Sequence, residues 1–319
     1  MSFSSDIKRE LTGLRIKRES DALALLSAFT LSIGSLKLIP NLRQWGVHFV
    51  SENEAAVTLI AKLSAQYYGL ECSISKVSHE RLNAVYNELL LYGESVERFM
   101  LDTGIMSIDN DGDKTFSPRL PNDIADTETK SRAFLRGLFL ACGTVTEPQK
   151  AYHAEFVFKN AEIADCANDL LMQFGINAKR TRRKASELVY IKDGEQLENL
   201  LALMGASSAM MAVTETRIIK QASNEANRSV NCINANLERV SKTALRQAGD
   251  IRLVIDTIGY DNLPEQLRMV AEARLNNYEM SLLELAEELG IGKSAVNYRL
   301  KRLSEMAEDI RIGVTPKIV

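Results

Sequence analysis

A short pattern that occurs twice limits what this chain can fold into. Residues 26–36 read LSAFTLSIGSL and residues 135–145 read LRGLFLACGTV. Small and apolar residues occupy matching positions, and glycine followed by a hydroxyl residue closes each copy. Ala28 in one copy and Gly137 in the other would let two helix backbones approach closely. The duplication therefore predicts two similar units in one chain.

The segments after each copy also repeat. Asn53 and Asn160 each precede an apolar-periodic run, and Gly69 and Gly175 each follow one, which are start and stop signals for a helix. Strand-like stretches flank these runs at residues 47–50, 72–77, 84–86, 154–158, 178–183 and 188–191. Each unit is therefore predicted to read helix, hairpin, helix, hairpin, helix, which is an α+β architecture.

The composition sets limits on the class of protein. A length of 319 residues allows two or three domains with separate cores. With 45% apolar and 25% charged residues, no apolar run of roughly 20 residues and no signal-peptide pattern, we expect a cytoplasmic protein outside the membrane. The net charge of −3 means that a nucleic-acid surface would have to come from local clustering. Reduced, buried thiols are expected at Cys72, Cys142, Cys166 and Cys232.

One predicted strand carries five cations within six residues. They are Lys179, Arg180, Arg182, Arg183 and Lys184. Alternation along a strand would place Arg180 and Arg182 on one face, and Lys179 and Arg183 roughly on the other. One interpretation is a solvated edge strand whose cations block aggregation. The other is a phosphate contact on an exposed sheet.

Residues 279–303 are typical of a helix-turn-helix. Ser281 and Glu284 have the spacing of a capping box, and Gly290 would supply the turn. The buried stripe of the second helix is predicted to comprise Val296, Leu300 and Leu303. Its remaining positions are Lys293, Ser294, Asn297, Tyr298, Arg299, Lys301 and Arg302.

The two predicted helices differ in charge. Residues 290–304 contain four cations and no acid, whereas the first helix carries three glutamates. This asymmetry favours a recognition helix in a major groove over a helix pair that touches no DNA. Asn297 is a candidate adenine reader, and Arg299 is a candidate guanine reader or phosphate clamp. Further candidates for DNA contact are Ser281, Arg180, Arg182, Arg183 and Lys184.

The repeated helices resemble the LAGLIDADG signature of homing endonucleases. In that family an acid just before the final glycine holds the metal ion. The corresponding residues here are Ile33 and Cys142. The resemblance therefore implies a nuclease scaffold that lacks the oxygen ligands of a hard cation. We expect Gly34 and Gly143 to end the two helices in the left-handed conformation.

Over nearly its whole length the chain resembles the WhiA family of bacterial regulators. The resemblance rests on residues 2–11, the two repeated helices, residues 227–237 and residues 293–300. It implies a catalytically inactive, tandem-repeat homing-endonuclease-like domain of the α+β class, followed by an all-α helix-turn-helix domain. Family members act in sporulation gene control, or in cell division and chromosome segregation. Gly292 departs from the Ser or Thr cap of many recognition helices, which would loosen the start of that helix.

The expected domains are a scaffold at 1–222, with repeats at about 20–101 and 128–205, a linking helix at 223–249 and the helix-turn-helix at 250–319. Within the last domain we expect a short helical stretch at 250–258 and a supporting helix opened by Pro264. Because the two repeats already pair within one chain, a free monomer is expected.

Other chemistry is mostly excluded. The sequence at 109–113 resembles a calcium loop, but Lys114 stands where glycine is needed and Leu120 where a bidentate Glu is needed, so a turn is expected. The three histidines lack metal-ligand spacing, and no glycine-rich phosphate loop occurs. We therefore predict no cofactor and no metal ion.

Three hypotheses follow from the sequence. The favoured one is a DNA-binding regulator associated with the nucleoid, with double-stranded DNA as its partner. An active metal-dependent endonuclease would need carboxylates at positions 33 and 142. The third is a division-machinery adaptor whose N-terminal sheet binds a protein. The first and third do not exclude each other.

Overall fold

The chain folds into two compact units, Met1–Lys220 and Gln221–Val319. One helix, α8 (Ser207–Ile258), contributes its first turns to the first unit and its remainder to the second. No helix in the described part of the chain has the length and apolarity that crossing a bilayer requires. The domain limits expected from the sequence stay predictions. The structure is a computed structural model that describes residues 2–79, 84–109 and 111–316.

Two repeats of the predicted order form the first unit. Each contains a four-stranded antiparallel sheet, in the order β1-β2-β4-β3 in the first repeat and β7-β8-β10-β9 in the second. The first repeat comprises α2 (Glu19–Ile33), β1 (Ser35–Ile39), η1 (Pro40–Leu42), β2 (Gln44–Ser51), α3 (Glu54–Tyr68), β3 (Glu71–His79), β4 (Ala84–Tyr92) and α4 (Val96–Thr103). The second comprises α5 (Glu128–Cys142), β7 (Gly143–Val145), β8 (Ala154–Phe158), α6 (Ala161–Gln173), β9 (Lys179–Arg183), β10 (Ser186–Ile191) and α7 (Gly194–Met204). α1 (Phe3–Thr12) precedes both repeats, and β5 (Ser107–Ile108) pairs with β6 (Lys114–Thr115) between them.

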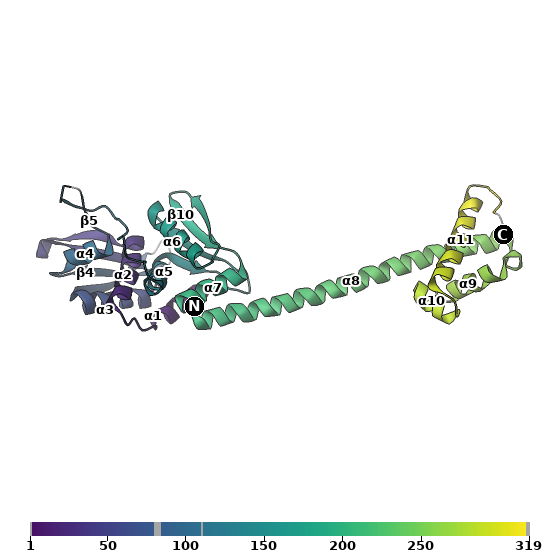
Figure 1. Cartoon of the computed structure of the whole chain (residues 1–319), viewed down its shortest axis with the longest axis horizontal. Helices are drawn as coiled ribbons and strands as arrows, with labels where there is room; N and C mark the ends of the chain where they lie inside the picture. Colours follow the sequence, from purple (N-terminus) through teal and green to yellow (C-terminus); the bar gives the residue numbers. More distant parts are fainter. Residues whose placement is uncertain (1, 80–83, 110, 317–319) are drawn as a thin grey trace. The chain divides into compact units, whose positions relative to one another are not determined.

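The repeated helices α2 and α5 lie side by side at the centre of the first unit (Figure 1). They meet where the side chains are smallest. A Cβ atom added to Gly137 would lie 2.4 Å from the carbonyl oxygen of Leu25 and 2.8 Å from the Cβ of Ala28. The close approach predicted from Ala28 and Gly137 is confirmed. Phe29 and Phe139 are fully buried, and each such side chain contributes roughly 1.5–3 kcal/mol to folding.

The glycines that end these two helices do not adopt the left-handed conformation expected from the sequence. Gly34 and Gly143 are extended, with φ of −67° and −83°. Space requires glycine here: a Cβ would lie 2.4 Å from the Thr30 carbonyl oxygen at Gly34 and 2.3 Å from a Phe139 ring carbon at Gly143. The expectation was wrong because the chain passes directly from each helix into a strand.

The predicted start and stop signals of the second helix in each repeat are confirmed. Asn53 caps α3 and Asn160 caps α6, each by accepting a backbone hydrogen bond of 2.8 Å on its side-chain oxygen. Gly69 and Gly175 have φ of 65° and 72°, which glycine adopts without steric cost. Local sequence therefore fixes where these helices begin and end.

The calcium-like sequence forms a turn between β5 and β6. The Asp109 carboxylate accepts backbone hydrogen bonds from Asp111 and Asp113, at 3.0 and 2.9 Å. Asn110, which belongs to the same motif, lies outside the described residues. The aspartate thus has a local structural role, as is common in turns.

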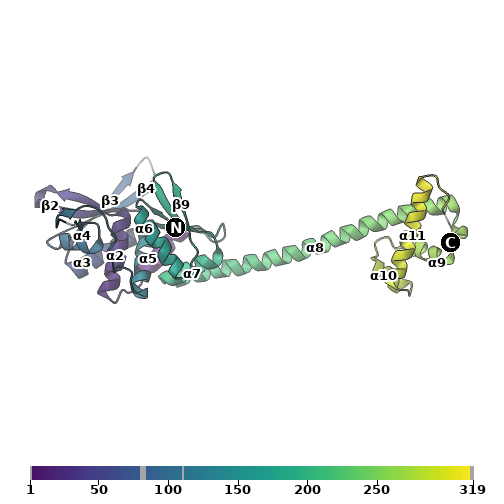
Figure 2. The ribbon, with the colours of Figure 1, turned by 45° about the horizontal axis from the view of Figure 1, so that its top comes forward.

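The second unit is a helical bundle. The short helix η3 (Tyr260–Asn262) follows α8 in the chain. Figure 2 shows the next three helices, α9 (Glu265–Asn276), α10 (Leu282–Glu288) and α11 (Lys293–Arg311), around the C-terminal turns of α8. Asp250 of α8 accepts a hydrogen bond of 2.6 Å from Arg311 of α11. The expected linking helix at 223–249 and the stretch at 250–258 form one continuous helix. Core residues of the bundle include Ile251, Val254, Val270, Leu285 and Leu300.

We expect Gly137→Ala to destabilise the first unit by about 1–3 kcal/mol, because the added methyl group overpacks the contact between α2 and α5. Gly249→Ala is the matched control, since a Cβ there meets nothing within 4 Å. Removing a helical glycine without a clash should stabilise the second unit by about 0.5–1 kcal/mol. Scanning calorimetry should show the two shifts with opposite sign. Equal shifts would contradict the close-contact interpretation.

Candidate nucleic-acid interface

The predicted helix-turn-helix is formed by α10 and α11. The Ser281 hydroxyl accepts from the Glu284 amide at 3.3 Å, and the Glu284 carboxylate accepts from the Ser281 amide at 2.6 Å, which completes the capping box. These hydrogen bonds lower the pKa of Glu284. Gly290 makes the turn with φ of 64°, and Gly292 begins α11 without a side-chain cap. The local signals of this motif are therefore confirmed.

The first turns of α11 expose a polar and cationic surface. The stripe expected to be buried, Val296, Leu300 and Leu303, lies in the bundle core. Exposed side chains on the other faces are Lys293, Ser294, Asn297, Tyr298 and Lys301. We call these five residues the α11 face. Because the first turns of a recognition helix are the ones that reach base edges, this surface has the placement that DNA reading needs.

Two predicted contact residues are partly engaged by the protein itself. Arg299 is half-buried and donates a hydrogen bond of 3.4 Å from Nη2 to Oε1 of Gln266 on α9. Arg302 is also half-buried, with Nη1 3.6 Å from Oε2 of Glu305. Neither side chain belongs to the exposed α11 face. Their contacts with DNA stay predictions.

Sequence reasoning missed Glu305 and Gln266. Glu305 lies one helical turn after Lys301, with 3.9 Å between Nζ and Oε1, and it marks the end of the cationic part of α11. Its position just beyond the acid-free stretch was visible in the sequence. Gln266 is separated from Arg299 by a turn and another helix, so only the fold brings the two together.

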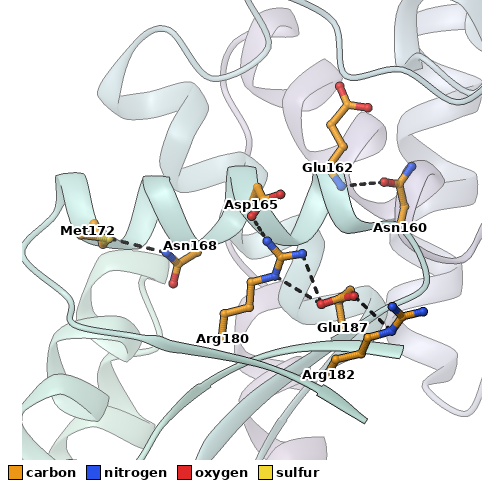
Figure 3. A network of polar contacts seen from close by, with 8 residues as sticks. All are labelled: Asn160, Glu162, Asp165, Asn168, Met172, Arg180, Arg182 and Glu187. Carbon is orange, nitrogen blue, oxygen red and sulfur yellow. Dashed lines mark hydrogen bonds and ion pairs between the residues drawn. The ribbon is translucent and has the colours of Figure 1, made fainter. Parts of the chain in front are cut away.

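The basic strand β9 carries its cations on both faces of the sheet. The register places Arg182 opposite Glu187, and Arg180 opposite the buried Val189, on the face that α6 covers. Figure 3 shows the Arg180 guanidinium directed at Asp165 of α6 and Glu187 of β10. The distance from Arg180 Nη2 to Glu187 Oε2 is 3.2 Å, and that from Arg182 Nε to Glu187 Oε1 is 3.7 Å. These two arginines therefore have carboxylate partners within the first unit.

The other strand cations lie toward open solvent. Arg183 and Lys179 share the opposite face of the strand, which confirms the predicted alternation. Lys184 follows at the turn with φ of 57°, an uncommon conformation for a residue with a side chain. Within the ranges that the structure describes, these three side chains are exposed and form no ion pair.

The ends of α2 and α5 hold the positions that carry metal-binding acids in homing endonucleases. Ile33 offers no donor atom, and the Cys142 thiol donates to the Leu138 carbonyl oxygen at 3.3 Å. Burial raises the pKa of Cys142 to about 12, while the nearby Lys8 ammonium and a Ser32 hydrogen bond oppose that rise. Burial also lowers the pKa of Lys8.

These groups do not fit a hard divalent cation. Magnesium and calcium prefer carboxylate and carbonyl oxygens, whereas the helix ends offer an alkyl group and a protonated thiol beside Lys8. The one carboxylate that interacts with Lys8 is that of Glu52. Across residues 2–79, 84–109 and 111–316, no group of three or more His, Cys, Asp or Glu side chains is placed to hold a metal ion. Lys8 comes from α1, so its presence here could not be read from the repeated pattern.

Comparison with known proteins identifies the family. The model of the WhiA LAGLIDADG-like domain matches residues 131–223, and that of the WhiA C-terminal HTH domain matches residues 226–307. A protein of Clostridium botulinum named "Probable cell division protein WhiA" is 35% identical over 319 residues, covering 98% of this chain and 100% of its own. This chain belongs to the WhiA family.

Further WhiA proteins agree in sequence and fold. A relative of the same name from Clostridium acetobutylicum is 37% identical over 315 residues, covering 98% of this chain and 99% of its own. The crystal structure of full-length WhiA from Thermatoga maritima is 27% identical, with a TM-score of 0.60 over 97% of this chain and 98% of that one. The predicted fold class, a LAGLIDADG-like α+β domain followed by a helical helix-turn-helix domain, is confirmed.

The cysteines differ in exposure more than the sequence suggested. All four are free thiols, but Cys72 and Cys232 are exposed, so the expectation of buried thiols is wrong for these two. Cys142 and Cys166 are half-buried, and burial raises the pKa of Cys166 to about 11. Cys72 is exposed on β3 and Cys232 is exposed on α8. That both are cysteines did not by itself predict this exposure.

We expect iodoacetamide at about pH 8 to alkylate Cys72 and Cys232 and to spare Cys142, because the thiolate is the reactive form. Peptide mass mapping of the folded chain measures this difference.

The thiol pKa of Cys142 is raised from 9.0 to about 12, so above about pH 9 the unfolded chain releases a proton that the folded chain keeps. The contribution of Cys142 to stability should therefore fall as the pH rises above about 9. Equal labelling of all three thiols would count against this account.

Proposed function

We propose that this WhiA family member is a DNA-binding regulator that acts in cell division and binds duplex DNA through α11. The observation that carries the proposal is the α11 face, where exposed cations surround Asn297 and Tyr298 without an acid until Glu305. The helix-turn-helix match and the relatives named for cell division support it. Sporulation control, chromosome segregation and association with the nucleoid belong to the same proposal.

Electrostatics would supply affinity and the base edges would supply selectivity. Lys293 and Lys301 can approach phosphates, and each phosphate neutralised releases condensed counterions, so binding should weaken as salt is added. Asn297 has the donor and acceptor that match adenine in the major groove. The Ser281 hydroxyl accepts the capping hydrogen bond, so its O–H group can still donate to a phosphate in the proposed contact.

The first unit is proposed to act as a scaffold without catalysis. The contacts of Cys142 and Lys8 support this, because Ile33 and Cys142 supply no carboxylate at the helix ends. The nearby Glu52 is a single acid, and it interacts with the Lys8 ammonium. The exposed strand cations Arg183 and Lys184 are proposed as a second phosphate contact.

We expect Lys301→Ala to weaken binding to a random-sequence duplex and to reduce the salt slope of log K by about 1. Lys242→Ala on α8 is the control: the two lysine side chains are 73% and 75% exposed, and each has a glutamate four residues away. Fluorescence anisotropy across a series of salt concentrations gives both slopes. An equal effect of the two variants would show that net charge, and not α11, determines affinity.

A second pair of variants separates the two faces of β9. Arg183→Ala should weaken duplex binding, because its side chain has no partner within the described part of the protein. Arg180→Ala should leave binding unchanged but lower the stability of the first unit by about 0.5–2 kcal/mol, since Asp165 loses its partner and Glu187 keeps only Arg182. Anisotropy and urea unfolding measure the two effects. The opposite pattern would place the DNA contact on the helix-covered face.

An adaptor role for the first unit is a second candidate, favoured by one observation. Trp45 and Phe116 are exposed with ring centroids 5.2 Å apart, and the exposed Leu38 is the cross-strand neighbour of Trp45. Exposed apolar clusters of this kind are more typical of protein contacts than of DNA contacts. The two roles are compatible, because they use different units.

A further inference from the structure

A long segment of α8 in the second unit is exposed to solvent on all sides. Every residue from 221 to 239 is exposed. Three large apolar side chains lie in this segment, Val230, Ile233 and Leu237, with 53%, 59% and 60% of their surface accessible. Large apolar side chains at regular spacing on a solvent-exposed helix indicate a surface that binds another helix.

These side chains follow the spacing of a coiled coil. Alternating steps of four and three residues connect Ala226, Val230, Ile233, Leu237 and Val240. We call these five residues the α8 seam. The same steps continue through Ala244, Gln247, Ile251 and Val254, which are all buried, and the last two belong to the bundle core. The seam is therefore the uncovered continuation of a face that the second unit already packs.

The residues beside the seam carry no charge. In a heptad with Val230 and Leu237 at the first position, the flanking positions that meet a partner helix are occupied by Asn227, Ser229, Asn234, Asn236, Ser241 and Thr243. The charged residues lie on the far side of the helix, and they include Arg228, Glu238, Arg239 and Lys242. Glu238 and Lys242 pair with each other at 2.7 Å, so their charges are compensated locally.

The bare segment also has poor intrinsic helix propensity. It contains five asparagines, which favour caps and turns over helix interiors, namely Asn224, Asn227, Asn231, Asn234 and Asn236. Isolated helices are marginal in water even for better sequences. Packing along the seam would supply the missing stabilisation.

We propose that the α8 seam pairs with the α8 seam of a second copy of this chain. Charged flanks select particular partners and disfavour self-pairing when they are alike, and the neutral flanks here impose neither restriction. A symmetric contact needs a surface that is complementary to itself, which an apolar seam between neutral amides and hydroxyls provides. This proposal departs from the free monomer expected from the sequence, because that expectation rested on the paired repeats of the first unit and did not consider α8.

The seam is short, so the dimer is weak. Two heptads of small and medium apolar side chains should give a weak dimer, with a dissociation constant below about 1 mM. The contact does not involve the α11 face, and it is measured without DNA. Its test is thus independent of the proposed DNA binding.

Sedimentation equilibrium of the full chain should show a reversible monomer–dimer equilibrium. Leu237→Glu should abolish the dimer, because it places two charges in the apolar seam. Leu245→Glu is the matched control: Leu245 lies on the same helix, is 59% exposed, and stands outside the heptad seam, so its dimer should persist. Circular dichroism below the dissociation constant, where the wild-type chain is also monomeric, should show the same helix content for all three chains.

A gain of affinity provides a second test that does not depend on disrupting the chain. Ala226→Leu enlarges the seam and should tighten the dimer about tenfold. Ala235→Leu adds the same side chain on the far side of the helix and should change nothing. A wild-type chain that stays monomeric up to about 1 mM would overturn the proposal and leave the seam to another protein. So would equal effects of the paired variants.

Discussion

The close contact between α2 and α5 is the constraint on which the first unit depends. The two helices can meet only because Gly137 has no side chain where the Leu25 carbonyl lies, and because Ala28 is small. That approach joins the two repeats through one core and brings the C-terminal ends of both helices together. In homing endonucleases those ends carry acids. Here Cys142 and Lys8 meet near the ends of the two helices, where they supply a thiol and an amine.

The cationic side chains of the two units differ in whether they have carboxylate partners. In the first unit Arg180 and Arg182 are matched by Asp165 and Glu187, so much of the basic strand is compensated before any ligand arrives. In the second unit the cations of the α11 face point to solvent, and Glu305 limits the cationic surface to the first turns. This contrast favours α11 of the second unit as the main proposed DNA contact, with the exposed Arg183 and Lys184 of the first unit as an additional proposed phosphate contact.

One apolar repeat runs along α8 through a buried and an exposed part. Ile251 and Val254 of this repeat are buried in the bundle, whereas Ile233 and Leu237 are exposed to solvent. Neutral flanks make the open part self-complementary, whereas the α11 face is cationic and is proposed to bind DNA phosphates. A weak self-contact and a salt-sensitive DNA contact would therefore respond to different conditions.

The sequence by itself determined the repeated order of helices and hairpins, the helix caps at Asn53 and Asn160, and the helix-turn-helix, because these follow from local periodicity and capping. It failed where distant residues meet. The extended glycines at the ends of α2 and α5, the partners of Arg180 and the engagement of Arg299 by Gln266 were decided only by tertiary structure. Spacing along a chain reports which face a residue occupies, but not which side chain, carbonyl or charge will be packed against that face.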